Sequence, residues 1–130
     1  MILLDTHVVV WMASGDSRLS AKASTAIREA RTSVRGLAVS DITLFELSLL
    51  FRKKRFELAV DPEFFLSDIE RRFVVLPITA NIALQAFELP ARYPKDPVDR
   101  ILGATALVED IPLLTADREI RKSRAVATIW

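Results

Sequence analysis

The sequence predicts an α/β fold, in which a mostly parallel sheet carries helices on both of its faces. Short apolar runs alternate with longer helical segments along all 130 residues, and this alternation is typical of parallel strands joined by crossover helices. The first run, residues 1–4, is wholly apolar, as expected for a strand that is covered on both sides. The length suits one domain spanning residues 1–130.

Capping residues and turns delimit the elements of the first half. Ser20 is a helix cap, and Ser40 with Asp41 begins another helix. That helix ends in the basic run 52–55, which lies near the negative end of the helix dipole. We expect, in order, a helix over residues 6–13, a helix over 20–31, a strand over 37–39 and a helix over 42–52.

The second half continues the alternation. Asp61 and Pro62 form a helix start, Thr79 caps a further helix, and the loop 90–97 contains three prolines. We expect, in order, a helix over residues 62–72, a strand over 73–76, helices over 79–89 and 97–109, a strand over 112–115, a short helix from 117 and a strand over 126–129.

Composition excludes several classes of protein. The absence of cysteine rules out disulfides, thiolate zinc sites and cysteine nucleophiles. Three scattered glycines leave no glycine-rich phosphate loop, and a net charge of +1 gives no overall attraction to nucleic acid. No apolar run reaches the roughly 18 residues of a membrane span, and no basic region precedes the first run as in a signal peptide. We therefore expect a cytoplasmic protein without a membrane partner.

Four acids are expected to meet at one rim of the sheet. Asp5 directly follows the first strand, and Asp117 follows Thr115, the end of a later strand, with one residue between them. Glu46 lies in the helix after the second strand, and Asp99 lies in the first turn of the helix after the proline loop. Because open α/β sheets place their ligand crevice at the carboxyl ends of the strands, these side chains are expected to lie close together.

Each acid also has an ordinary structural explanation. Asp5 and Asp117 could be helix caps, and Asp99 could favour a helix N-terminus. Glu46 could take part in a salt bridge. Four carboxylates together, however, must take up protons or bind a cation. An all-oxygen set suits Mg²⁺ or Mn²⁺, and such an ion with open positions for water and phosphate oxygens is what metal-assisted phosphodiester hydrolysis requires.

The sequence resembles the PIN-domain family, and in particular the VapC-type ribonuclease toxins of type II toxin–antitoxin systems. The resemblance covers essentially the whole chain. It rests on residues 3–7 (Leu-Leu-Asp-Thr-His), 40–47 (Ser-Asp-Ile-Thr-Leu-Phe-Glu-Leu), 96–102 (Asp-Pro-Val-Asp-Arg-Ile-Leu) and 113–117 (Leu-Leu-Thr-Ala-Asp). By this resemblance, the metal-binding and catalytic acids are Asp5, Glu46, Asp99 and Asp117. Thr115 matches a hydroxyl position that supports the site.

The resemblance implies a single three-layer PIN domain with about five parallel strands and a Mg²⁺- or Mn²⁺-dependent endoribonuclease. It also implies a homodimer, an RNA substrate and a cognate antitoxin whose C-terminal segment lies across the acidic groove. One segment departs from the family pattern. Members often carry a histidine before the Asp-Pro pair, where this chain has Tyr93, Pro94 and Lys95.

Several charged residues have two interpretations each. Asp96 is either a fifth acid of the site or the cap of the helix that begins at Pro97. The basic run 52–55 either follows an RNA backbone or is a solvated helix end. Arg100 and Arg118 each follow a proposed metal ligand directly, which makes them candidates for binding substrate phosphate.

Two ring side chains follow Asp5 on the first helix. We expect His7 to be a rim residue rather than a metal ligand, because hard cations prefer oxygen. We expect Trp11 to pack in the core or in a dimer interface rather than against bases.

Two functions are consistent with the sequence. The first is the metal-dependent ribonuclease toxin, which would hydrolyse RNA with a metal-activated water. The alternative is a catalytically inactive PIN-like module that binds RNA or protein. The complete set of acids favours the enzyme, and Mn²⁺ binding distinguishes the two.

Overall fold

Five parallel strands form the central sheet of the computed structural model, which describes residues 1–55 and 58–130. The strands are β1 (Ile2–Leu4), β2 (Leu37–Ser40), β3 (Val74–Leu76), β4 (Leu113–Leu114) and β5 (Thr128–Ile129). Their order is β3-β2-β1-β4-β5, so the first strand of the chain lies in the middle of the sheet. The predicted α/β class with a parallel sheet is confirmed.

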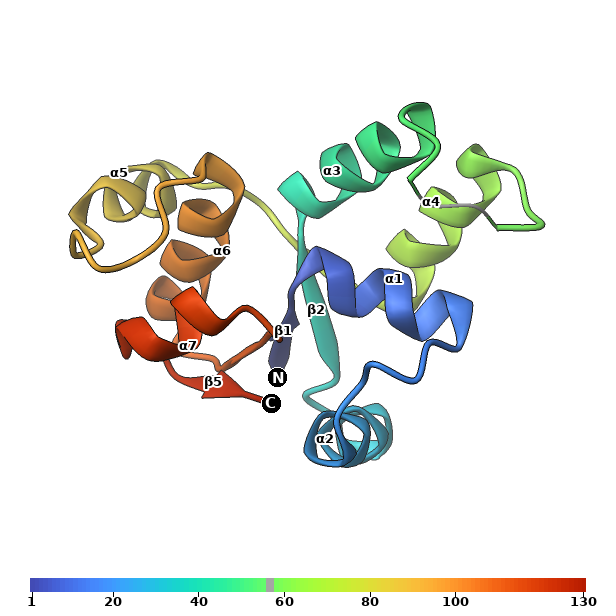
Figure 1. The fold of residues 1–130 in the computed structure, drawn as a ribbon, viewed down its shortest axis with the longest axis horizontal. Coiled ribbons are helices and arrows are strands. Elements are labelled where there is room, and N and C mark those ends of the chain that lie inside the picture. The colour runs from blue at the N-terminus through green and yellow to red at the C-terminus, as the bar shows by residue number, and fades with distance from the viewer. Residues whose placement is uncertain (56–57) are drawn as a thin grey trace.

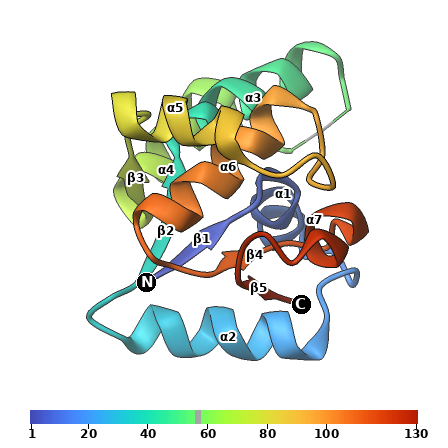
Figure 2. The ribbon, with the colours of Figure 1, turned by 90° about the vertical axis from the view of Figure 1, so that its left-hand side faces the viewer.

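Helices cover both faces of this sheet. They are α1 (Thr6–Ser14), α2 (Ala21–Thr32), α3 (Asp41–Arg52), α4 (Pro62–Arg72), α5 (Ala80–Glu88), α6 (Pro97–Val108) and α7 (Arg118–Ser123). Figure 1 shows α1, α3 and α4 to the right of the central strands and α5, α6 and α7 to the left. Figure 2 shows α2 running along the bottom of the molecule. No helix in the part of the chain that the structure describes is long and apolar enough to cross a membrane.

Strand side chains alternate between two cores, because successive residues of a strand point to opposite faces. Leu4 and Leu114 pack in a cluster with α1, α2, α3 and α4. Their neighbours Leu3 and Leu113 pack in a second cluster with α6 and α7. All four leucines are fully buried. The apolar runs that form β1 and β4 thus correspond to strands that are covered on both sides.

The predicted caps begin the helices as expected. Ser20, Asp61 and Thr79 each accept a hydrogen bond from a backbone N–H in the first turn of the helix that follows. The basic run 52–55 lies at the end of α3 with its side chains exposed. This placement agrees with the solvated helix end that was one of its two interpretations.

The strand order reverses next to β1. The chain passes from β1 to β2 and β3 on one side of the sheet and then returns to pair β4 with the other side of β1. Open α/β sheets bind ligands at the carboxyl ends of the strands beside such a reversal. Asp5 directly follows the carboxyl end of β1, so the fold places it at this position.

Candidate active site

A cavity of about 370 Å³ lies at the carboxyl ends of β1 and β4. Its lining residues are Asp5, His7, Trp11, Glu46, Asp96, Asp99, Ala116 and Asp117. The four acids singled out from the sequence therefore line one cavity, and Asp96 is a fifth acid on its wall. Carboxylates from α3, α6 and the loops after β1 and β4 surround the same space.

Asp5 is both a helix cap and a wall of the cavity. Its carboxylate is buried, and one oxygen accepts a hydrogen bond from the backbone N–H of His7 at 3.3 Å. The other oxygen accepts a 2.6 Å hydrogen bond from the hydroxyl of Thr115. The ordinary explanation of Asp5 as a cap is thus correct, and it does not exclude a place in the site.

Thr115 connects the ends of two neighbouring strands. Its hydroxyl is fully buried, donates to Asp5 and accepts a 3.0 Å hydrogen bond from the backbone N–H of Asp117. Asp117 in turn caps α7 by accepting from the N–H of Ile120 at 2.9 Å. One hydroxyl therefore sets the position of Asp5 relative to the backbone of Asp117.

The loop before α6 directs Asp99 into the cavity. Asp96 caps α6 by accepting hydrogen bonds from the N–H groups of Val98 at 2.9 Å and Asp99 at 3.3 Å. Pro97 occupies the first turn, where a missing N–H costs nothing. Asp96 is therefore the cap of this helix, and because it also lines the cavity, its role as a fifth acid of the site stays a prediction.

The site carries negative charge without a basic partner. Burial, followed by the charges of Asp5, Asp96, Asp117 and Glu46, raises the pKa of Asp99 to about 7. No lysine or arginine in residues 1–55 and 58–130 forms an ion pair with any of the four acids. His7 is the nearest base, with its Nδ1 3.9 Å from an oxygen of Asp5, and its pKa is raised by hydrogen bonding to Asp5 and by the surrounding carboxylates. Such a site favours a bound cation.

The donor chemistry fits a hard divalent cation, since every acid supplies oxygen and the excess charge is uncompensated. The side chains are nevertheless not preassembled. Within the described ranges, no group of three or more acidic or histidine side chains stands in an arrangement that could hold a metal ion. The acids share the cavity, and binding one ion in common would require their side chains to turn inward.

Comparison with known proteins agrees with this geometry. Residues 2–125 match the family model for the PIN domain. The chain belongs to the PIN-domain family. This PIN-domain protein is 37% identical to "Ribonuclease VapC22" of Mycobacterium tuberculosis (strain ATCC 25618 / H37Rv), over 99% of this chain and 98% of that protein. It is accordingly a VapC-type member of the family.

Solved structures share the fold. VapBC-1 from nontypeable Haemophilus influenzae superposes with a TM-score of 0.72 at 18% sequence identity, covering 98% of this PIN-domain chain and 96% of that chain. A toxin–antitoxin complex from Klebsiella pneumoniae gives a TM-score of 0.70 at 22% identity, with 98% and 97% covered. The predicted PIN fold is confirmed.

The two candidate phosphate-binding arginines do not line the cavity. The guanidinium of Arg100 donates to the carbonyls of Ala86 at 3.0 Å and Leu89 at 3.3 Å, where α5 of the PIN domain ends. Its positive charge thus stabilises the negative end of that helix. Arg118 is exposed at the first position of α7. Their roles in substrate binding stay predictions.

Trp11 is the cavity residue that the sequence interpretation missed. Its indole lines the acidic cavity, and no core cluster of the described residues contains it, so the core half of the expectation is wrong. The other half, a place in a dimer interface, stays a prediction. His7, by contrast, lies exposed at the rim as expected. The available signal was spacing, because His7 and Trp11 are four residues apart and share one face of the helix that begins at Asp5.

Tyr93, from the segment that departs from the expected family pattern, does not line the cavity. Its ring is fully buried and its hydroxyl donates a 2.7 Å hydrogen bond to the backbone carbonyl of Asp99. Tyr93 therefore stabilises the first turn of α6 through a hydrogen bond to its backbone.

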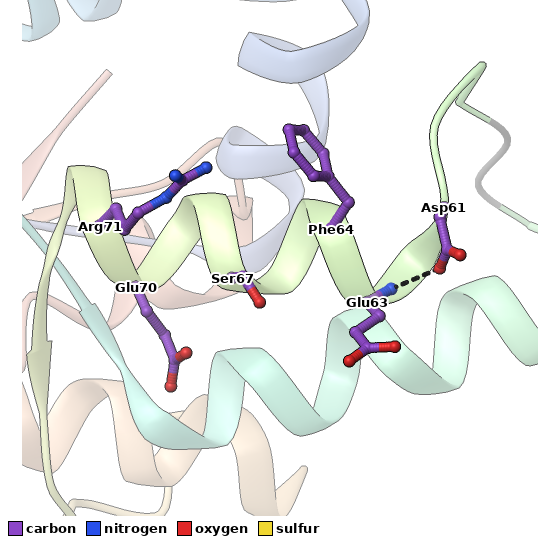
Figure 3. A pocket seen from close by; sticks show the side chains of 6 residues that line it. All are labelled: Asp61, Glu63, Phe64, Ser67, Glu70 and Arg71. Carbon is purple, nitrogen blue, oxygen red and sulfur yellow. Dashed lines mark hydrogen bonds between the residues drawn. The ribbon is translucent and has the colours of Figure 1, made fainter.

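A second hollow of about 570 Å³ lies on α4 and shares no lining residue with the acidic cavity (Figure 3). Its lining residues are Asp61, Glu63, Phe64, Ser67, Glu70 and Arg71. All of them belong to one helix and its cap, and Figure 3 shows Phe64 and Arg71 on one side of that helix and Glu63 and Glu70 on the other. A surface with a single wall does not enclose a substrate, so the acidic cavity is the candidate active site.

Proposed function

We propose that this chain is a Mg²⁺- or Mn²⁺-dependent endoribonuclease that acts as the toxin of a toxin–antitoxin pair. The observation that carries the proposal is a single cavity lined by the four proposed ligand carboxylates and by Asp96, in which burial and the neighbouring acids raise the pKa of Asp99 to about 7. The resemblance to a protein named as a ribonuclease over nearly the whole chain supports the reaction class.

In this proposal, the metal ligands are Asp5, Glu46, Asp99 and Asp117. The bound ion would lower the pKa of a water molecule and neutralise charge on the scissile phosphate. The chain itself orients the ligands. Thr115 holds one oxygen of Asp5 through a 2.6 Å hydrogen bond, and Asp96 fixes the helical turn that carries Asp99. Such supporting contacts commonly change metal affinity by about 10–100-fold when they are removed.

We also propose a cognate antitoxin as the protein partner and RNA as the substrate. Two of the structural neighbours are a VapBC protein and a toxin–antitoxin complex, which supports the antitoxin. A homodimer and a cytoplasmic location follow from the family resemblance and stay predictions. The alternative function is the inactive binding module, which is favoured by the absence of a preassembled metal-ligand group in the described residues.

Replacement of one acid tests the proposal. Asp5→Asn keeps the shape and the helix cap but removes a charge, and we expect it to reduce Mn²⁺-dependent RNA cleavage at least about a hundredfold. Asp110→Asn is the matched control, because Asp110 is exposed and does not line the cavity. Circular dichroism should show both variants folded, and EDTA should abolish cleavage by the unchanged protein.

Two outcomes would contradict the enzyme. Cleavage that persists in EDTA would exclude the metal, and full activity of Asp5→Asn would exclude the site. If calorimetry shows no binding of Mn²⁺ and the protein does not cleave RNA, the inactive module is the better description.

A further inference from the structure

Trp11 occupies a position that core packing does not explain. The side chain is half-buried, yet it belongs to no core cluster in residues 1–55 and 58–130. Trp130, the ring next to it, does pack against the core formed with α1, α2, α3 and α4. The indole of Trp11 instead forms part of the wall of the acidic cavity.

Two rings lie next to Trp11. The His7 imidazole, whose Nδ1 is 3.9 Å from an oxygen of Asp5, lies 6.4 Å from the Trp11 ring, and the Trp130 ring lies 5.7 Å from it. The planes of His7 and Trp130 are tilted from that of Trp11 by 53° and 55°, so neither ring covers it as a stacked ring would. Trp11 is thus not stacked face to face with either ring, and its side chain forms part of the cavity wall.

Arg18 holds the indole from one side. Its guanidinium carbon lies 4.9 Å from the Trp11 ring centroid, and Asp16 fixes the guanidinium through a 2.7 Å ion pair. This contact fixes the ring without burying it in the core. A rigid aromatic surface loses little entropy when a ligand stacks on it, and aromatic side chains are the usual partners of unstacked bases.

We propose that Trp11 stacks on a base of single-stranded RNA next to the scissile phosphate. This inference rests on the proposed ribonuclease function, because the acids define where that phosphate lies. Trp11 and the carboxylates line the same cavity, so a nucleotide whose phosphate is held at the carboxylates can place a neighbouring base beside the indole. A base inside a duplex is paired and stacked and cannot reach this surface. Every base has a flat face, so Trp11 selects single strands rather than a particular sequence.

Steady-state kinetics with a single-stranded RNA oligonucleotide and Mn²⁺ test this role. We expect Trp11→Ala to raise KM about tenfold, as loss of one stacked base does, with kcat changed less than about threefold because binding rather than chemistry is affected. Trp11→Phe keeps a ring and should stay close to the unchanged protein. Trp11→Leu has similar apolar bulk without a ring, and it replaces the alanine variant if that variant does not fold.

A matched control and a modified substrate identify the contact. Phe64→Ala removes an exposed ring on α4, outside the cavity, and should leave KM unchanged. Oligonucleotides with one abasic nucleotide at successive positions around the cleaved bond locate the base. In the unchanged protein, one position should lower kcat/KM about tenfold. At that position Trp11→Ala should lose nothing further, since the partner of the base is already absent.

Fluorescence gives a readout that does not depend on cleavage. The chain contains two tryptophans, so Asp5→Asn combined with Trp130→Phe leaves Trp11 as the sole emitter in a protein expected not to cut. A single-stranded oligonucleotide with Mg²⁺ should quench its emission, and the same sequence as a duplex should not.

The outcomes separate the two proposals. If the unchanged protein does not cleave RNA with Mn²⁺, the proposed function fails. If the unchanged protein cleaves RNA but Trp11→Ala has a normal KM, the stacking role is overturned while the proposed enzyme stands. The same holds if Trp11→Ala and the abasic nucleotide reduce kcat/KM independently at every position, so that their effects multiply. A fall in Mn²⁺ affinity of Trp11→Ala, measured by calorimetry, would also overturn it by showing that the ring acts on the acids instead.

Discussion

The surroundings of two aspartates, Asp16 and Asp99, shift their pKa values in opposite directions. Asp16 lies at the surface, and hydrogen bonds from the side chain and backbone of Arg18 lower its pKa. Asp99 lies in the cavity, where burial and four neighbouring acids raise its pKa to about 7. The first carboxylate is neutralised by the chain itself, whereas the second lacks a cation. The difference agrees with the proposal that the cavity binds a cation.

This difference predicts a pH-dependent stability in EDTA. The pKa of Asp99 is higher in the folded than in the unfolded chain, so its contribution to stability is full below about pH 4 and is lost as the pH rises towards 7. Asp99→Asn has no such loss. We expect the variant to melt about 3 °C higher than the unchanged protein at pH 8, a modest shift because solvent screens this half-buried group. The difference in melting temperature between the two proteins should become smaller as the pH falls towards 4.

Differential scanning fluorimetry from pH 4 to 8 measures this effect. Saturating Mn²⁺ should reverse the order of the two proteins at pH 8, because only the unchanged protein keeps all the proposed ligands. If the melting temperatures of the two proteins differ by the same amount at every pH, the raised pKa of Asp99 is contradicted.

At the scale of elements, the position of α6 depends on the absence of a side chain at Gly103. A Cβ at Gly103 would lie 2.5 Å from the hydroxyl oxygen of Tyr93 and 2.6 Å from its ring carbon Cζ. The absence of that carbon lets the phenol pass beside the helix and reach the carbonyl of Asp99. Glycine is therefore needed at position 103 for the close approach of Tyr93. Its backbone conformation does not require a glycine, because its φ is not in the left-handed region. Tyr93 and Gly103 together seat the helix that carries an acid of the site.

We predict that Gly103→Ala destabilises the protein by about 1–3 kcal/mol, because the added carbon overpacks a closed interface. Tyr93→Phe should cost about 1 kcal/mol through loss of the hydrogen bond to Asp99. The double variant should be more stable than the sum of the two losses implies, since the hydroxyl that clashes most closely with the new carbon is gone. Urea denaturation measures all three, and strict additivity would show that the two sites do not interact.

At the scale of the whole molecule, the helices α5 and α6 present an apolar face to solvent. Leu84 and Phe87 on α5 are 70% and 86% exposed, and an apolar hollow of about 230 Å³ between α5 and α6 lies beside Phe87. Exposed apolar groups gathered in this way are typical of an interface between proteins. The dimer expected from the family resemblance would remove them from water.

We therefore predict that Phe87→Glu converts a dimer into a monomer. The substitution places a charge at the proposed interface, and the exposure of Phe87 means that the fold of the single chain should not change. Phe64→Glu on α4 is the matched control, because it adds the same charge at another exposed phenylalanine. Sedimentation velocity distinguishes the two states. A monomeric unchanged protein, or a dimer that survives Phe87→Glu, would contradict the prediction.

The sequence could predict those features that depend on neighbouring residues. Apolar runs marked the strands, and Asp5 after β1 and Asp96 before Pro97 marked helix starts, because caps act within one turn. Placing acids at strand ends then predicted the shared cavity, since parallel strands end at one edge. The contacts of Arg100 could not be predicted, because they depend on how α5 packs on α6. Those of Trp11 could not be predicted either, because they depend on the position of Trp130, which is distant in the sequence.

The central position of β1 has a consequence for the order of synthesis. The cavity combines Asp5, which follows β1, with Asp117, which follows β4, a strand that pairs with β1 but comes much later in the chain. A growing chain that has not yet produced β4 lacks Thr115, Asp117 and half of the support of its central strand. The acids of the proposed site therefore come together only after β4 has been synthesised, and a nascent chain that lacks β4 should not cleave RNA.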